Sequence, residues 1–203
     1  MSFAPANEGI SKLKPYQPGK PISELERELG ITDIVKLASN ENPLGCSDKV
    51  KEAVAAELAQ IGRYPDGGGF ILKDEIHTQF GVAHNCITLG NGSNDLLEIF
   101  ARAFVSDKDS VVFSQHAFAV YALLTQAINA EAIEVPAQGF SHDLEAMAAA
   151  IKSNTKLVFI ANPNNPTGTW FEEAEFDRFM QKVPSHVIVV LDEAYVEYFP
   201  ENF

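Results

Sequence analysis

The sequence has little cysteine, few positive charges and no long apolar run. Its two cysteines, Cys46 and Cys86, exclude a disulfide framework in a chain of 203 residues and indicate a reducing, cytoplasmic setting. Lys and Arg total 15 against 28 Asp and Glu, a net charge of −13, which argues against nucleic acid or an anionic membrane as a partner. No stretch approaches the roughly 18 apolar residues of a membrane span. The first residues carry no apolar signal segment either.

The remaining composition is that of a globular protein, with 46% hydrophobic and 21% charged residues. From residue 71 on, apolar strands alternate with amphipathic helices. Strands are predicted at residues 86–89, 110–114, 132–136, 156–161 and 186–192. Near-continuous apolar strands that alternate with helices indicate an α/β fold, in which a mostly parallel sheet lies between two helical layers.

The N-terminal part of the chain follows a different pattern. Residues 1–21 contain four prolines, so they are predicted to form an extended arm. Ser47 precedes a run rich in Ala, Glu and Lys and is predicted to cap a helix. No metal site is predicted, because His77, His84 and Cys86 have no recognised ligand spacing.

Three strand ends carry unusual polar residues, and ligands of open α/β sheets bind at the carboxyl ends of strands. Gly90–Asn94 is a Gly-rich turn before a helix, suited either to a phosphate or simply to a tight, capped turn. The second segment, 162–168, reads Asn-Pro-Asn-Asn-Pro-Thr-Gly, where two prolines fix a rigid loop that can aim an amide at a ligand. The third is Leu191–Tyr195.

Asp192 stands at the end of the last apolar strand. A buried carboxylate there is costly unless it meets a cation or a strong donor. The alternative is that Asp192 caps a helix and that Tyr195, three residues later, is packed in the core.

Together with residues 15–21, 37–45 and 63–66, these segments resemble the fold-type I aminotransferases, which use pyridoxal 5'-phosphate (PLP). The Asn-Pro-Thr-Gly loop and Asp-Glu-Ala-Tyr are marks of the superfamily. Pro-Tyr-Gln-Pro-Gly-Lys-Pro and Asn-Glu-Asn-Pro are most similar to the histidinol-phosphate aminotransferases within it.

The resemblance implies a role for each side chain near the cofactor ring. Asp192 would face the pyridine nitrogen and keep it protonated, so that the ring withdraws electrons more strongly. Asn165 and Tyr195 would hydrogen-bond the ring oxygen. Phe118 occupies the position of an aromatic side chain that stacks on the ring; many relatives have tyrosine there, so Phe118 keeps the stacking and lacks a hydroxyl.

The resemblance also implies how the rest of the cofactor and the substrate are held. The phosphate would be bound by three residues of the Gly-rich turn: Gly92, Ser93 and Asn94. Tyr64 would reach the same phosphate from the neighbouring subunit, which implies a homodimer. Tyr16 and Asn42 resemble positions on the substrate side.

The implied organisation is an N-terminal arm with part of a small domain in residues 1–62, followed by an incomplete PLP-binding large domain in residues 63–203. The implied reaction transfers an amino group between histidinol phosphate and 2-oxoglutarate in histidine biosynthesis. Three alternatives remain open: an aromatic amino acid aminotransferase, a decarboxylase of a phosphorylated amino acid, and a fragment without catalysis.

The sequence departs from the pattern of the family in one respect, and this departure limits the activity expected of these 203 residues. The family's reaction depends on a lysine in a later strand, and no lysine follows Asp192. The chain by itself is therefore predicted to be an inactive transaminase and an unstable monomer. A titration with PLP tests this: an absorbance band of a lysine imine that disappears with borohydride would show the prediction to be wrong.

Overall fold

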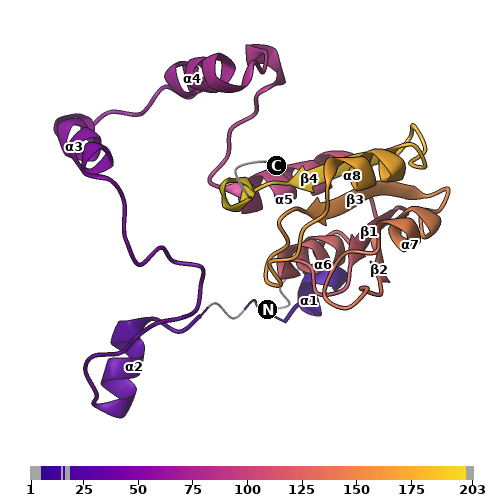
Figure 1. The fold of residues 1–203 in the computed structure, drawn as a ribbon, viewed down its shortest axis with the longest axis horizontal. Helices are drawn as coiled ribbons and strands as arrows, with labels where there is room; N and C mark the ends of the chain where they lie inside the picture. Colours follow the sequence, from indigo (N-terminus) through magenta and orange to yellow (C-terminus); the bar gives the residue numbers. More distant parts are fainter. Residues whose placement is uncertain (1–5, 15, 17–18, 200–203) are drawn as a thin grey trace, which may run out of the picture. The chain divides into compact units, whose positions relative to one another are not determined.

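The computed structural model describes residues 6–14, 16 and 19–199 of the chain (Figure 1). It divides into two compact units, one formed by residues 1–14 with 88–203 and the other by residues 15–87. The predicted arrangement of an arm and small-domain part over residues 1–62 and a large-domain part over 63–203 stays a prediction.

The first unit is built on a four-stranded parallel sheet. Its strands are β1 (Ser110–Ser114), β2 (Glu131–Val135), β3 (Thr155–Ala161) and β4 (Ile188–Asp192). Their order across the sheet is β2-β1-β3-β4, and every pairing is parallel. The predicted α/β class with a parallel sheet is confirmed.

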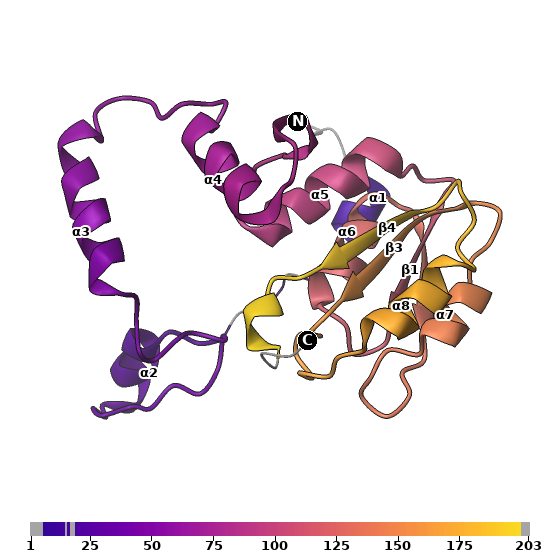
Figure 2. The same cartoon turned by 45° about the horizontal axis from the view of Figure 1, so that its top comes forward.

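Helices cover both faces of this sheet (Figure 2). One face carries α5 (Ser93–Phe104) and α6 (Ala119–Ala127), and the other carries α7 (Leu144–Ala149) and α8 (Glu173–Met180). Because side chains alternate along a strand, Leu157 and Phe159 of β3 belong to the first core, whereas Val158 and Ile160 belong to the second. Both faces of β3 are therefore buried, which explains its unbroken apolar sequence.

The prediction of a strand at residues 86–89 is wrong. A 3-10 helix, η2 (His84–Cys86), stands at its start, and residues 87–90 belong to no strand. A strand needs a neighbour to satisfy its backbone groups. Within the described part of the chain, the sheet offers this segment no partner.

The predicted extended arm is also wrong in part, because α1 (Glu8–Ser11) is helical and packs on α6. The side chain of Asn7 accepts a hydrogen bond from the Gly9 N–H at 3.0 Å and another from Asn129 Nδ2 at 2.5 Å. Gly9 is buried against the backbone of α6, and this close approach requires a residue without a side chain.

The second unit contains α2 (Ile22–Leu29), α3 (Asp48–Glu57), η1 (Leu58–Gln60), α4 (Phe70–Phe80) and η2. The predicted cap of α3 is confirmed, since Ser47 Oγ accepts from the Val50 N–H. None of its helices contains a buried residue. Across the residues that the structure describes in both units, no helix is long and apolar enough to cross a membrane.

Replacing Gly9 with alanine is expected to detach α1 from α6. The new Cβ would lie 1.9 Å from the carbonyl oxygen of Gln126, so the backbone has to shift, at a cost of about 1–3 kcal/mol. Urea unfolding of the protein encoded by the complete gene measures the loss. Gly62→Ala is the matched control, because a Cβ at Gly62 meets nothing within 4 Å. Equal stability of the two variants would contradict the packing.

Candidate active site

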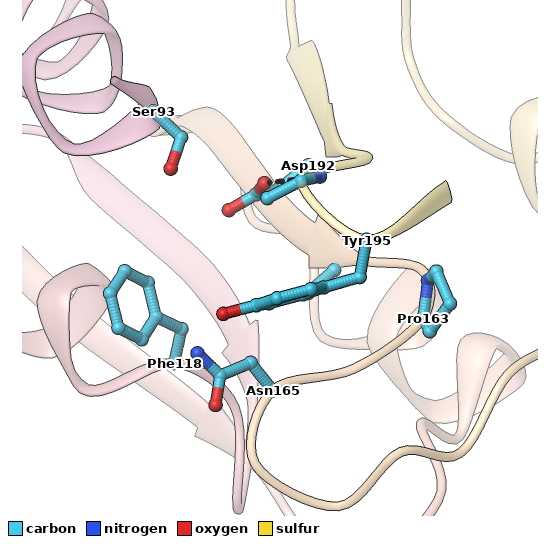
Figure 3. A pocket seen from close by; sticks show the side chains of 8 residues that line it. Ser93, Phe118, Pro163, Asn165, Asp192 and Tyr195 are labelled. Carbon is cyan, nitrogen blue, oxygen red and sulfur yellow. Dashed lines mark hydrogen bonds between the residues drawn. The ribbon is translucent and has the colours of Figure 1, made fainter. Parts of the chain in front are cut away.

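The carboxyl ends of β3 and β4 meet the start of α5 at a small pocket of about 50 Å³ (Figure 3). The pocket is lined by Ser93, Phe118, Ala161, Pro163, Asn165, Asp192, Ala194 and Tyr195. Figure 3 shows the polar ends of Ser93, Asn165, Asp192 and Tyr195 directed into one space, with the ring of Phe118 at its side. Two of the strand ends that the sequence singles out, those of β3 and β4, therefore meet the Gly-rich turn in one site, although this turn follows no strand.

Asp192 is placed by the pairing of the two strands. It is the last residue of β4 and pairs with Ala161 of β3, and its carbonyl oxygen accepts from the Asn162 N–H at 3.0 Å. Its carboxylate accepts from the Ala194 N–H at 3.2 Å through Oδ1 and from the Tyr121 hydroxyl at 2.9 Å through Oδ2. Each carboxylate oxygen thus accepts one hydrogen bond, and the carboxylate lines the pocket.

The loop after β3 is held by two buried asparagines. The side chain of Asn162 donates to the Phe171 carbonyl and accepts from the Phe171 N–H, both at 3.1 Å. The amide of Asn164 donates to the His116 carbonyl at 3.0 Å and to Thr167 Oγ1 at 2.7 Å. With Asn162 and Asn164 fixed in this way, Asn165 is the amide of this loop that lines the pocket.

The N-terminus of α5 contributes backbone donors. Gly92 precedes the helix with φ +80° and provides no side-chain cap. The first four N–H groups of a helix lack partners within it, and the helix dipole adds positive potential at the same end. This end of α5, with the hydroxyl of Ser93 at the pocket, is a suitable place for an anion.

Phe118 reaches the pocket from the turn between β1 and α6. His116 has φ +59°, an uncommon conformation for a residue other than glycine, and the Ala117 N–H returns to the Ser114 carbonyl at 3.2 Å. This tight turn places Phe118 immediately before α6, so that its ring lies beside the pocket (Figure 3).

A second, larger hollow adjoins the pocket. A groove of about 410 Å³ shares Ser93, Asp192 and Ala194 with it. The groove is lined otherwise by apolar side chains of α5 and β4: Leu96, Leu97, Phe100, Val189, Val190 and Leu191, with Glu193 at its end. Asp192 therefore lies where the small pocket and the apolar groove adjoin.

The structure brings together five predicted residues: Ser93, Phe118, Asn165, Asp192 and Tyr195. Gly92 and Asn94 flank Ser93 at the start of α5. Tyr16, Asn42 and Tyr64 belong to the second unit, and their roles stay predictions. Tyr121, Asn162, Asn164 and His142 are supporting residues that the sequence reasoning did not find. The paired asparagines in 162–168 were the available signal for two of them.

His142 contacts the last residue of β3, immediately before the asparagine loop. Its Nε2 lies 2.9 Å from the carbonyl oxygen of Ala161, and its Nδ1 is buried with no hydrogen-bond partner among the residues that the structure describes. Burial lowers the pKa of His142, although the bond to Ala161 opposes the shift. The neutral ring, with the proton on Nε2, is therefore the form that fits the folded protein.

Comparisons with known proteins agree with this geometry. The family model "Aminotransferase class I and II" matches residues 32–203. Histidinol-phosphate aminotransferase 1 of Idiomarina loihiensis is 59% identical over 196 residues, which is 97% of this chain and 53% of that protein. Histidinol-phosphate aminotransferase 2 of Pasteurella multocida is 56% identical over 192 residues, 95% of this chain and 53% of that protein.

The solved structures show the same likeness. The histidinol-phosphate aminotransferase of Sinorhizobium meliloti, solved in complex with pyridoxal-5'-phosphate, has a TM-score of 0.87 and 28% identity, and the match covers 98% of this chain and 53% of that one. The aspartate aminotransferase of Rhizobium meliloti, at 18% identity and a TM-score of 0.79 over 100% of this chain and 54% of that one, shares the fold.

The chain belongs to the class I and II aminotransferases, and the resemblance to histidinol-phosphate aminotransferases inferred from its motifs is confirmed. It spans about half the length of the curated relatives that it matches.

The free energy of unfolding is expected to fall as the pH drops below about 6.5, the ordinary pKa of histidine. His142 has a lowered pKa in the folded state, so the unfolded chain binds the proton more readily and stability is lost as the pH falls toward that lowered pKa. Urea unfolding across this range measures the slope.

His142→Gln should remove this part of the slope, because glutamine keeps an N–H donor and does not titrate. His186→Gln is the control, since His186 is exposed. If the slope survives in His142→Gln and disappears in His186→Gln, the assignment to His142 is wrong.

Proposed function

We propose that this chain forms the cofactor-binding N-terminal part of a PLP-dependent aminotransferase that acts on histidinol phosphate with 2-oxoglutarate. The observation that most directly supports this proposal is the position of Asp192. Its carboxylate lies at the mouth of the pocket beside Phe118, Asn165 and Tyr195 (Figure 3). A carboxylate beside an aromatic ring and neutral donors suits a protonated, flat heterocycle.

The donor set fits PLP part by part. Asp192 would hold the proton on the ring nitrogen, and Phe118 would keep the ring in one plane by stacking. Asn165 and Tyr195, whose polar ends point toward the same space, would donate to the ring oxygen. When bound, the cofactor supplies an electron-withdrawing ring that stabilises negative charge at the substrate carbon.

The phosphate of the cofactor would lie at the start of α5. Gly92, Ser93 and Asn94 would present backbone N–H groups there, and Ser93 adds a hydroxyl. Gly92 has φ +80°, a backbone conformation that glycine adopts without strain. The turn that leads into the start of α5 therefore favours glycine at this position. The helix dipole then partly neutralises the dianion.

Residues of the second unit complete the proposal. Tyr64 is fully exposed, and we place it on the cofactor phosphate of a neighbouring subunit in a homodimer. Tyr16 and Asn42 would contact the substrate. The cytoplasmic location and the division into an arm with small-domain part (1–62) and a large-domain part (63–203) belong to the same proposal.

The proton-transferring lysine would come from the length of the relatives that this chain does not span. Among the described residues that line the pocket, none is a lysine. Within the proposal, the chain supplies cofactor binding and ring protonation. A lysine elsewhere in the full protein supplies the covalent attachment and the proton shuttle.

Assay of the protein encoded by the complete gene tests the activity. Glutamate formation from 2-oxoglutarate should require both PLP and histidinol phosphate. Faster reaction with phenylalanine or tyrosine as amino donor would instead support the aromatic aminotransferase. Release of carbon dioxide without glutamate would support the decarboxylase, and no turnover with any donor would contradict an aminotransferase.

Asp192→Asn is expected to lower kcat on the order of 100-fold or more, because an amide cannot hold the positive charge on the ring. Binding of PLP should weaken as well, as measured by the absorbance of the bound cofactor. Glu197→Gln is the control, since it removes one negative charge from the same segment at an exposed position outside the pocket. Equal kcat in the two variants would remove the basis of the proposal.

A further inference from the structure

Tyr121 contacts the Asp192 carboxylate and is not among the residues that line the pocket. It is fully buried on α6, and its hydroxyl donates to Asp192 Oδ2 at 2.9 Å. The other oxygen, Oδ1, accepts from the Ala194 N–H. In Figure 3 one oxygen of Asp192 carries the dashed hydrogen bond, and the other oxygen is directed into the pocket. The Tyr121 hydroxyl thus touches the same oxygen that faces the proposed ring.

The position of this hydroxyl is fixed by aromatic packing. The ring of Tyr121 stacks on Phe159 of β3, with centroids 4.8 Å apart and planes at 9°. Its edge meets Phe118, with centroids 5.9 Å apart and planes at 89°. Such contacts restrict the ring to one orientation. Tyr121 therefore joins the stacking residue and the carboxylate of the site in one rigid group.

In the hydrogen bond between Tyr121 and Asp192, the hydroxyl can act only as the donor. Burial, together with the charge of Asp192, raises the pKa of Tyr121 well above its usual range. The phenol therefore keeps its proton and always acts as donor. The titratable side chains lining the pocket are Asp192 and Tyr195, and Glu193 lines the adjoining groove.

We propose that Tyr121 is a positioning residue that keeps the Asp192 carboxylate turned toward the ring nitrogen of PLP. The inference rests on the proposed function for the identity of the ring. It adds that the proton on that nitrogen depends on a hydroxyl that does not touch the cofactor. Without the hydroxyl, the carboxylate is free to turn, so that its hydrogen bond to the ring nitrogen is weakened.

The test uses the protein encoded by the complete gene, loaded with PLP labelled with 15N in the ring. The 15N chemical shift reports whether the nitrogen carries a proton. In Tyr121→Phe, the pH at which the nitrogen loses its proton should fall by about one unit, and PLP should bind roughly tenfold more weakly. Titration curves that coincide with those of the wild type would overturn the proposal.

Thr125→Val is the matched control for lost packing. Thr125 is buried on the same helix, and its Oγ1 donates to the Tyr121 carbonyl at 2.8 Å. This variant loses one buried hydrogen bond of α6 and should leave the ring-nitrogen titration unchanged. If the titration of the ring nitrogen shifts equally in both variants, Tyr121 contributes only to the packing of the site. In an Asp192→Asn background, Tyr121→Phe should have no further effect on the nitrogen.

A cofactor-free measurement separates this inference from the proposed function. In crystals of the cofactor-free protein encoded by the complete gene, the Asp192 carboxylate of Tyr121→Phe should be turned from its wild-type orientation, whereas Thr125→Val should keep that orientation. Absence of PLP binding by the wild type would overturn the proposed function, whereas an unchanged orientation of the Asp192 carboxylate in Tyr121→Phe would overturn the role of Tyr121.

Discussion

The site depends on one carboxylate placed at the end of a parallel strand. β3 and β4 pair in register up to Ala161 and Asp192, and the next N–H, that of Asn162, is bonded to the Asp192 carbonyl. The strand pairing therefore carries the acid and the first residue of the asparagine loop to the same edge together. Taking a carboxylate out of water is costly, and the Ala194 N–H and the Tyr121 hydroxyl offset part of that cost. The remaining side of the carboxylate is open to a cationic ligand.

The sequence predicted those parts of the site that depend on strand polarity. In a parallel sheet, residues that follow successive strands lie on one edge, whatever their separation in sequence. Asn165 follows β3 and Asp192 ends β4. The apolar runs predicted these two strands, and the Gly-rich turn predicted the start of α5. These signals are local, so the meeting of these three segments could be inferred without coordinates, whereas the place of Phe118 was implied only by the family resemblance.

The supporting contacts could not be predicted in this way, because they depend on side-chain packing across elements. Tyr121 has the sequence context of an ordinary core residue on α6, and its bond to Asp192 spans 71 positions. His142 reaches Ala161 across 19 positions. The strand expected at residues 86–89 failed for a related reason: an apolar run predicts a strand only where a neighbouring strand completes its hydrogen bonds.

The acidity of the chain raises a question about how it would hold a phosphate. A net charge of −13 repels anions at long range, and the pocket itself contains Asp192 and no lysine or arginine among its lining residues. Within the proposal the attraction is short-range, and the start of α5 would supply it through backbone N–H groups and the helix dipole. These groups keep their partial charges at every pH and need no reorganisation. An acidic surface and an anion site are therefore compatible in one chain, provided that the anion lies within the first turn of α5 and the cationic ring extends from there to Asp192.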